Sequence, residues 1–286
     1  MTKILVIGAQ GQLGQSFQYW APHFLDLEFF FKDLPKFNLL DHDQLEQYFK
    51  SNPIDVVINC SAYTAVDQAE DEPKMARQLN AVAIDTLCKL SKSYGFKLIH
   101  FSTDYVFDGT ASKPYKESDP LKPIGVYGQT KAEGEDVMCS AGIDGWVIRT
   151  AWLFSPYAKN FVKTIFSLLR NEDEIKVVAD QTGSPTYAPD LAQAVLQAMS
   201  QKPTFSGVEI YHFANAGQTT WHGLATEIKK LLSSSCVIRQ VTSADYPTKA
   251  KRPKYSVLSC EKIKKEFNFT PRSWQSALEE CLKKIK

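Results

Sequence analysis

The sequence lacks a long apolar run, a large net charge and a clustered set of cysteines. Its longest apolar runs, 4–7 and 146–154, fall well short of the roughly 18 residues that predict a membrane-spanning helix. The first run is also shorter than the core of about 7–15 residues found in secretion signals, so we expect a cytoplasmic protein without a membrane partner. With 33 Lys and Arg against 32 Asp and Glu, the net charge of +1 creates no field that would attract nucleic acid.

Metal-binding and disulfide patterns are missing as well. The six cysteines form no C-x-x-C pair, and they do not combine with the five histidines at the spacing of a zinc site. We therefore expect no bound metal, and we interpret the cysteines as buried thiols of a protein from a reducing compartment. They are Cys60, Cys88, Cys139, Cys236, Cys260 and Cys281.

The remaining composition is that of a globular protein with a sizeable core. The 286 residues, 44% of them hydrophobic, predict one large domain or two closely joined ones. In the first half, short apolar runs alternate with helical spacing, which indicates parallel strands joined by right-handed helical crossovers. The expected strands are 3–7, 27–31, 55–59, 96–101 and 146–149, and the expected helices include 12–20, 43–50 and 74–94.

The second half of the chain has a different pattern, in which prolines separate helical stretches at 161–170 and 191–199. It predicts a smaller and more irregular α+β unit. The expected fold class is therefore α/β, with a doubly wound parallel sheet of the Rossmann type and a smaller C-terminal α+β domain. Ligands of such sheets bind at the carboxyl ends of the strands, so we expect the second half to cover that edge.

Three glycines follow the first expected strand. Gly8, Gly11 and Gly14 form the pattern G-x-x-G-x-x-G between that strand and the helix after it. A turn without side chains lets backbone N–H groups reach a pyrophosphate, and the positive end of the helix stabilises the charge of that group. A tight turn with no ligand would use the same residues, but the position between strand and helix favours a dinucleotide site.

An acidic residue about 20 positions further on would hold a ribose hydroxyl of the dinucleotide. Asp33 stands there, and the nearby Lys32 and Lys36 could instead accommodate a 2′-phosphate, so both NADPH and NADH are expected cofactors. We assign residues 1–153 to an NAD(P)-binding domain. Residues 154–286 are assigned mainly to substrate binding, with parts that pack back on the first domain.

A tyrosine and a lysine with complementary chemistry stand four residues apart. Tyr127 and Lys131 would share one face of a helix, and an ammonium beside a phenol makes the phenol a better acid toward a developing alkoxide. Thr103 ends the fourth expected strand, where it could donate to the same carbonyl oxygen or cap local backbone. These residues predict a ketoreductase site, whereas His100 in the same strand is interpreted as a core histidine.

Several blocks in this order resemble the extended short-chain dehydrogenase/reductase superfamily and, within it, the dTDP-4-dehydrorhamnose reductase family. The similarity extends over nearly the whole chain. The blocks are 8–14 (GAQGQLG), 59–67 (NCSAYTAVD), 101–109 (FSTDYVFDG), 126–131 (VYGQTK), 149–152 (RTAW), 160–161 (NF), 180–186 (DQTGSPT) and 252–253 (RP).

The resemblance implies reduction of dTDP-4-dehydro-β-L-rhamnose to dTDP-β-L-rhamnose with NADPH or NADH, which supplies an activated deoxysugar for surface polysaccharide. It implies that Tyr127 protonates the C4 oxygen, Lys131 holds the nicotinamide ribose and Thr103 orients the carbonyl. The implied cofactor contacts are Gly8, Gly11, Gln12, Leu13, Gly14, Asp33, Asn38, Leu39, Ala62, Tyr63, Thr64, Tyr127 and Lys131. The implied substrate contacts are Thr103, Asp104, Trp152, Asn160 and Arg252.

Two positions depart from the family pattern. Some members form dimers through magnesium held by glutamates, and the matching residues here are Gln15 and Pro189, which supply no carboxylate. We therefore expect a monomer or a homodimer without magnesium. Two of the implied substrate contacts also have structural alternatives, since Trp152 could be a core aromatic and Arg252 a surface charge.

Other functions use a similar fold. A dehydratase would carry an acidic residue at the position of Tyr105, and an epimerase would not consume reduced cofactor. Reductases of other nucleotide-4-keto-6-deoxysugars are an alternative, because one sequence does not place the residues that contact the sugar hydroxyls. A non-catalytic dinucleotide-binding regulatory subunit is a second alternative, because a fold does not fix a function.

Overall fold

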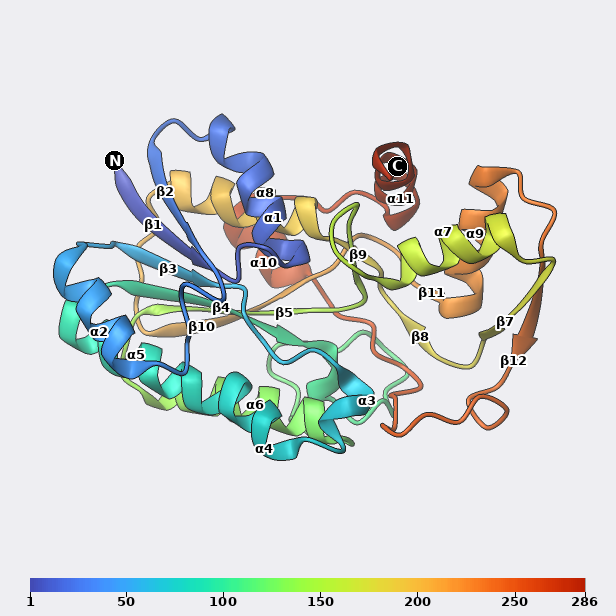
Figure 1. The fold of residues 1–286 in the computed structure, drawn as a ribbon, viewed down its shortest axis with the longest axis horizontal. Coiled ribbons are helices and arrows are strands. Elements are labelled where there is room, and N and C mark those ends of the chain that lie inside the picture. The colour runs from blue at the N-terminus through green and yellow to red at the C-terminus, as the bar shows by residue number, and fades with distance from the viewer. Residues whose placement is uncertain (286) are drawn as a thin grey trace.

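A six-stranded sheet forms the centre of the molecule, and every pair of neighbouring strands in it is parallel. The computed structural model describes residues 1–285. The strand order is β10-β5-β4-β3-β1-β2 (Figure 1). The strands are β1 (Thr2–Ile7), β2 (Leu27–Lys32), β3 (Val56–Asn59), β4 (Lys97–Thr103), β5 (Gly145–Thr150) and β10 (Val208–Phe213). The order changes direction at β1 and β3, the kind of point at which open α/β sheets bind ligands.

Helices cover both faces of this sheet, which confirms the doubly wound α/β fold predicted from the sequence (Figure 1). On one face lie α1 (Gln12–Trp20), α8 (Ala188–Ser200) and α10 (Glu261–Phe267), and on the other lie α2 (His42–Ser51), α5 (Ala83–Tyr94) and α6 (Val126–Ser140). Each layer encloses its own apolar core, because successive strand residues point to opposite faces.

The segment 74–94, expected as one helix, is interrupted in its first half. It consists of α4 (Pro73–Arg77), a π-helical turn (Gln78–Val82) and α5. Within the π-helical turn the buried Asn80 accepts the Tyr63 N–H at 2.9 Å and donates to the Tyr63 carbonyl oxygen at 3.1 Å. Apolar spacing does not reveal this wider turn, because the widening serves a polar contact with the loop after β3.

Segments from the second half of the chain complete the sheet and also build a smaller lobe beside it (Figure 1). β10 pairs with β5, and α8 packs against α1. No helix within residues 1–285 is long and apolar enough to cross a membrane. The lobe contains α7 (Phe161–Asn171), β7 (Glu174–Val178), α9 (Trp221–Leu232), β12 (Val237–Val241) and α11 (Trp274–Lys284), together with the short strands β6 (Leu153–Phe154), β8 (Thr182–Gly183), β9 (Thr186–Tyr187) and β11 (Thr219–Thr220).

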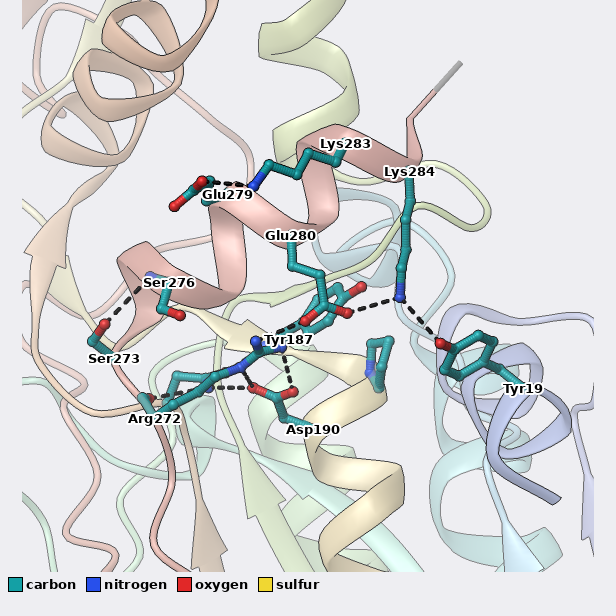
Figure 2. A network of polar contacts seen from close by, with 12 residues as sticks. Tyr19, Tyr187, Asp190, Arg272, Ser273, Ser276, Glu279, Glu280, Lys283 and Lys284 are labelled. Carbon is teal, nitrogen blue, oxygen red and sulfur yellow. Dashed lines mark hydrogen bonds and ion pairs between the residues drawn. The ribbon is translucent and has the colours of Figure 1, made fainter. Parts of the chain in front are cut away.

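Charged side chains connect α11 to α8 and α1, two helices that cover one face of the sheet (Figure 2). Arg272 donates to both carboxylate oxygens of Asp190 on α8, each at 2.8 Å, and lies 2.7 Å from Glu280 on α11. Lys284 lies 2.7 Å from Glu280 and 3.4 Å from the Tyr19 hydroxyl of α1. The end of the chain is therefore held against both α8 and the first helix.

One ion pair is buried in the centre of the fold. Arg149 on β5 and Glu135 on α6 each leave 2% of the side chain exposed, and the closest nitrogen–oxygen distance between them is 2.7 Å. Another nitrogen of Arg149 lies 3.2 Å from Nε2 of His212 on β10, whose Nδ1 lies 3.1 Å from the Tyr115 carbonyl oxygen. Burial, together with the charge of Arg149, lowers the pKa of His212 to about 3. The imidazole is therefore neutral and accepts from Arg149.

Replacement of Glu135 by Gln is expected to lower the free energy of unfolding by about 3–5 kcal/mol, because it leaves the buried Arg149 charge without its counter-ion. Urea titration at neutral pH measures this change. The matched control is Glu279→Gln, which removes an exposed pair with Lys283 and should leave the stability nearly unchanged. Equal effects of the two substitutions would contradict the role given to Glu135.

Stability is also expected to fall in acid because of His212. An imidazole in the unfolded chain binds a proton below about pH 6.5, whereas folded His212, with its pKa lowered to about 3, does not. Each pH unit below about 6.5 should therefore reduce the free energy of unfolding by up to about 1.4 kcal/mol through this residue. Urea titrations between about pH 6.5 and pH 4.5 should give a smaller pH slope for His212→Gln. An unchanged slope would mean that folded His212 is already protonated.

Candidate active site

The turn after β1 is shaped by close backbone packing. Gly8 has a φ of +79°, and its carbonyl oxygen accepts the Gly11 N–H at 3.1 Å. A Cβ on Gly14 would lie 2.2 Å from that same oxygen, so α1 can begin this close to β1 only with glycine there. Gly11 is the N-cap of α1 and places no side chain before the first amide groups of the helix. The turn therefore offers N–H donors and a positive helix end to a diphosphate.

The next two residues begin α1. The Gln12 side chain accepts from the Ser155 hydroxyl at 2.9 Å and donates to the Leu153 carbonyl oxygen at 3.4 Å. Gln12 thus joins the glycine turn to the first segment of the smaller lobe. The Leu13 side chain is buried in the core between α1 and the sheet, which leaves its backbone for contact with a ligand.

Asp33 follows directly after β2, at the same edge of the sheet as the glycine turn. Its two carboxylate oxygens accept the backbone N–H of Gln10 at 2.5 Å and of Leu34 at 2.7 Å. A surface cavity of about 590 Å³ opens beside it and is lined by Lys32 and Lys36 among others. An acidic partner for a ribose and basic partners for a phosphate therefore lie around one cavity.

Asn38 and Leu39 belong to the loop between β2 and α2. The Asn38 side chain accepts the Leu40 N–H at 3.0 Å, and Leu39 is buried in the core under α2 and α5. In this structure both side chains therefore hold the shape of the loop that leads away from Asp33.

Ala62, Tyr63 and Thr64 follow β3, whose carboxyl end lies beside that of β1. The backbone of Tyr63 is held by Asn80 on both its N–H and its carbonyl group, and its hydroxyl donates to Glu72 at 2.9 Å. These contacts fix the segment at the edge of the sheet, next to the glycine turn.

Helix α6 brings Tyr127 to the end of β4. The first amide group of α6, that of Val126, donates to Glu70 at 2.9 Å. A Cβ on Gly128 would lie 2.2 Å from the Tyr105 carbonyl oxygen, so the helix lies directly against the turn after β4. Burial raises the pKa of the Tyr127 phenol to about 12, and a hydrogen bond with Thr103 opposes this rise. The structure therefore brings together Tyr127 and Thr103, as the sequence predicts.

Lys131 lies one turn further along α6 and is almost completely buried, with 1% exposed. Its Nζ donates to the Phe101 carbonyl oxygen at 2.6 Å and lies 3.0 Å from Nε2 of His100. Burial lowers the pKa of Lys131 to about 8. The Lys131 amine thus contacts β4 directly, one helical turn after Tyr127.

Thr103 and Asp104 are buried where β4 ends. The Thr103 hydroxyl donates to Oδ1 of Asp104 at 3.1 Å and accepts the Tyr105 N–H at 3.2 Å, so it also caps local backbone. Burial raises the pKa of Asp104 to about 7. Within residues 1–285, Oδ2 of Asp104 has no hydrogen-bond partner.

Trp152 follows β5 in a constrained conformation, with a φ of +46°. Its ring stacks on Trp221 of α9, with centroids 3.5 Å apart and an interplanar angle of 6°. The Trp221 ring nitrogen donates to Gln181 at 3.1 Å, which fixes the pair from the other side. The aromatic side chain expected to contact substrate is therefore held rigidly between the sheet and the smaller lobe.

The other two expected substrate contacts already have partners within the chain. Asn160 is the N-cap of α7, where its side chain accepts the Lys163 N–H at 3.1 Å and donates to the Ser155 carbonyl oxygen at 2.9 Å. Arg252 makes two hydrogen bonds to Asp67, at 2.7 Å and 3.1 Å. This planar guanidinium presents the donor geometry that two diphosphate oxygens would accept.

The sequence analysis missed several residues that support these side chains. Asp67, Asn80 and Trp221 received no role, although each contacts or fixes a residue of the site. The interpretation of His100 as a core histidine agrees with its burial but omits its contact with Lys131. One residue in the sequence did indicate buried polar contacts at this edge of the sheet. Asn59 is a polar residue at the carboxyl end of an otherwise apolar strand.

No group of three or more His, Cys, Asp or Glu side chains is arranged to hold a metal ion in the part of the chain that the structure describes. The two positions that depart from the family pattern make other contacts. The Gln15 side chain donates to the Gln10 carbonyl oxygen at 2.6 Å, and the Pro189 carbonyl oxygen accepts from the Trp20 ring nitrogen at 2.8 Å.

Comparisons with known proteins agree with this geometry. The family model of the RmlD substrate binding domain matches residues 1–286. A curated dTDP-4-dehydrorhamnose reductase of Aggregatibacter actinomycetemcomitans is 38% identical and covers 97% of each chain. The crystal structure of a dTDP-4-dehydrorhamnose reductase from Clostridium acetobutylicum has a TM-score of 0.92 at 35% identity and covers 99% of each chain.

A second crystal structure is that of dTDP-4-dehydrorhamnose reductase from Bacillus anthracis in complex with NADP, with a TM-score of 0.93, 31% identity and 99% of each chain covered. The similarity in sequence and in structure extends over nearly the full length of these relatives. Four of the blocks that carry the resemblance, 8–14, 59–67, 101–109 and 149–152, lie at the carboxyl ends of β1, β3, β4 and β5. The chain belongs to the dTDP-4-dehydrorhamnose reductase family.

Proposed function

We propose that this protein reduces dTDP-4-dehydro-β-L-rhamnose to dTDP-β-L-rhamnose with NADPH or NADH, in the synthesis of an activated deoxysugar for surface polysaccharide. The observation that carries the proposal is the position of Tyr127, whose ring packs edge-on against Tyr105, with centroids 5.7 Å apart, in the turn that Thr103 begins at the carboxyl end of β4. That end lies two strands away from the glycine turn after β1. An acid for a developing alkoxide and a site for a dinucleotide thus share one sheet edge.

The residues at this edge fit a dinucleotide. Gly11 places no side chain before the first amide groups of α1, so the backbone turn can come close to a diphosphate, and Asp33 holds a carboxylate beside a cavity suited to a ribose. Backbone groups of 62–64 border the same edge. When bound, the reduced nicotinamide supplies the hydride. The preference between NADH and NADPH depends on whether Asp33 or the two nearby lysines make the stronger contact.

The proton comes from the chain itself. Tyr127 donates its phenolic proton to the C4 oxygen as negative charge develops there, and Thr103 donates a hydrogen bond to the same oxygen. The high pKa of Tyr127 keeps the phenol protonated until that charge appears. Lys131 then stabilises the Tyr127 phenolate that the proton transfer leaves, and it holds the ribose of the dinucleotide.

The substrate is held from the second half of the chain. We assign substrate binding mainly to residues 154–286, with Trp152 against the sugar, Asn160 at the start of α7, and Arg252 on the diphosphate. Asp104 offers its unpartnered oxygen to a sugar hydroxyl. Arg252 would exchange its bonds to Asp67 for bonds to phosphate oxygens.

The remaining parts of the proposal concern the setting of the reaction. The partners are small molecules, a nucleotide sugar and a dinucleotide, and we place the protein in the cytoplasm, where reduced dinucleotides are maintained. We expect the active form to be a monomer or a homodimer without bound magnesium, since Gln15 and Pro189 supply no carboxylate.

Replacing Tyr127 by Phe should reduce turnover about 10²–10⁴-fold, because the proton donor is lost, and should leave the affinity for the dinucleotide nearly unchanged. The measurement follows NADPH and NADH absorbance with enzymatically generated dTDP-4-dehydrorhamnose and identifies the product. The control Tyr246→Phe removes an exposed hydroxyl and should have no effect.

Dinucleotide binding without turnover by the wild type would contradict the proposed substrate and direct the assay to other nucleotide-4-keto-6-deoxysugars. If the protein's biological function survives Tyr127→Phe, it is a regulatory subunit.

Replacing Arg252 by Gln should raise the KM for the nucleotide sugar by roughly 10–100-fold, because two charge-assisted hydrogen bonds to the diphosphate are lost. The kcat should change little, since Arg252 lies away from the reacting carbonyl. Steady-state kinetics separates the two effects, and Lys251→Gln is the control for loss of a nearby exposed charge. An unchanged KM with lower stability would show that Arg252 serves only to hold Asp67.

A further inference from the structure

Three buried polar side chains form a line from the end of β3 to α6. Asn59, His100 and Lys131 are each 1% exposed. Nδ2 of Asn59 lies 3.2 Å from Nδ1 of His100, and Nε2 of His100 lies 3.0 Å from Nζ of Lys131. The line ends on Lys131, one helical turn after Tyr127.

The far end of this line fixes the orientation of the Asn59 amide. Its Oδ1 accepts the Ser61 N–H at 3.0 Å, so the NH₂ group, which can only donate, faces the imidazole. Nδ1 of His100 must then be the unprotonated acceptor. Burial lowers the pKa of His100 well below its usual range, which keeps the ring neutral. The single ring proton is therefore on Nε2.

This proton points at the Lys131 amine. An ammonium group has three donors and no acceptor, whereas a neutral amine has a lone pair. Only the neutral amine can accept the His100 N–H while it donates to the Phe101 carbonyl oxygen. In the opposite assignment, Lys131 is an ammonium and the His100 ring proton is on Nδ1. The Asn59 amide would then have to turn its oxygen toward the ring. Its NH₂ group would face the Ser61 N–H, and two donors would meet without an acceptor.

We propose that Asn59 and His100 are positioning residues that hold Lys131 as a neutral amine until the dinucleotide binds. Binding brings a negatively charged diphosphate and hydroxyl acceptors to the site, and both favour the ammonium form. One proton from solvent then joins the Lys131 nitrogen as the dinucleotide enters. The step consumes one proton, and the ammonium formed gives up the hydrogen bond from the His100 ring and donates to acceptors of the dinucleotide instead. It rests on the proposed function only for the identity of the ligand.

Burial and one carboxylate act in opposite directions on the pKa of Lys131. Burial brings its pKa to about 8, and the opposing field comes from Glu135, which is paired with Arg149 on β5. The other titratable groups at this end of α6 are Tyr127, on the turn before it, and Asp104, whose field reaches Tyr127. A donor from His100 lowers the lysine pKa further, because it stabilises only the amine.

The first test needs neither ligand nor variant. Long-range ¹H–¹⁵N NMR of the imidazole rings in the ligand-free protein reports which ring nitrogen carries the proton. His100 should be protonated on Nε2, whereas His212, with Nδ1 on a carbonyl oxygen and Nε2 on Arg149, should be protonated on Nδ1 and serves as the internal control. A proton on Nδ1 of His100 would overturn the proposal.

The second test follows the amine itself by ¹³C NMR of Cε-labelled lysine, with Lys131→Met to assign the resonance. Asn59→Leu frees the ring to place its proton on Nδ1 and to accept from an ammonium. It should raise the pKa of Lys131 by about one unit, which is the effect of one ordinary hydrogen bond. Asn171→Leu, at an exposed helix end, is the matched control and should leave that pKa unchanged. A wild-type Lys131 that titrates with the exposed lysines would refute the assignment.

The third test measures proton uptake directly. Calorimetric titration with NADPH near pH 8, in buffers of different ionisation enthalpy, should show uptake of a proton that becomes smaller in Asn59→Leu, because Lys131 is then already charged. NADPH binding without proton uptake in the wild type would contradict the proposed protonation of Lys131 on binding. Failure of NADPH to bind would instead contradict the proposed function and would leave the NMR results on the ligand-free protein to decide the present inference.

Discussion

The arrangement of the site depends on how closely α6 packs against the backbone beside it. A Cβ on Gly128 would lie 2.2 Å from the Tyr105 carbonyl oxygen, and one on Gly134 would lie 2.1 Å from the Asn80 carbonyl oxygen. The helix therefore touches the turn after β4 and the π-helical turn before α5 at the same time. Because packed interiors leave no room for adjustment, these two contacts fix the distance of Tyr127 from the end of β4.

The two buried basic side chains at α6, Arg149 and Lys131, each donate to an acceptor. Glu135 neutralises Arg149, and His212 accepts the guanidinium nitrogen that remains. Lys131 differs from Arg149, because its contacts are a carbonyl oxygen and an imidazole rather than a carboxylate. The permanent charge of Arg149 thus belongs to the fold, whereas Lys131, whose charge can change, lies one helical turn from the proton donor Tyr127.

The sequence predicted the strands and most helices of the sheet layer well, because alternating apolar residues and the glycine turn reflect local geometry. It placed Thr103 with Tyr127, since both positions follow from strand ends and helical spacing. It did not predict the π-helical turn at Asn80 or the stacking of Trp152 on Trp221, because each depends on residues brought together only by the tertiary fold. For the same reason Arg252 was expected on the substrate, while its pairing with Asp67 was unforeseen.

The contribution of late segments to the sheet has a consequence for how the chain is made. The apolar face of β1, β4 and β5 is covered by α8, and β5 gains its outer neighbour only with β10 at Val208–Phe213. A nascent chain that ends before residue 188 therefore exposes both an uncovered sheet face and an unpaired strand edge. Such surfaces promote aggregation, so the first half of the chain gains its full protection only when the second half has been made.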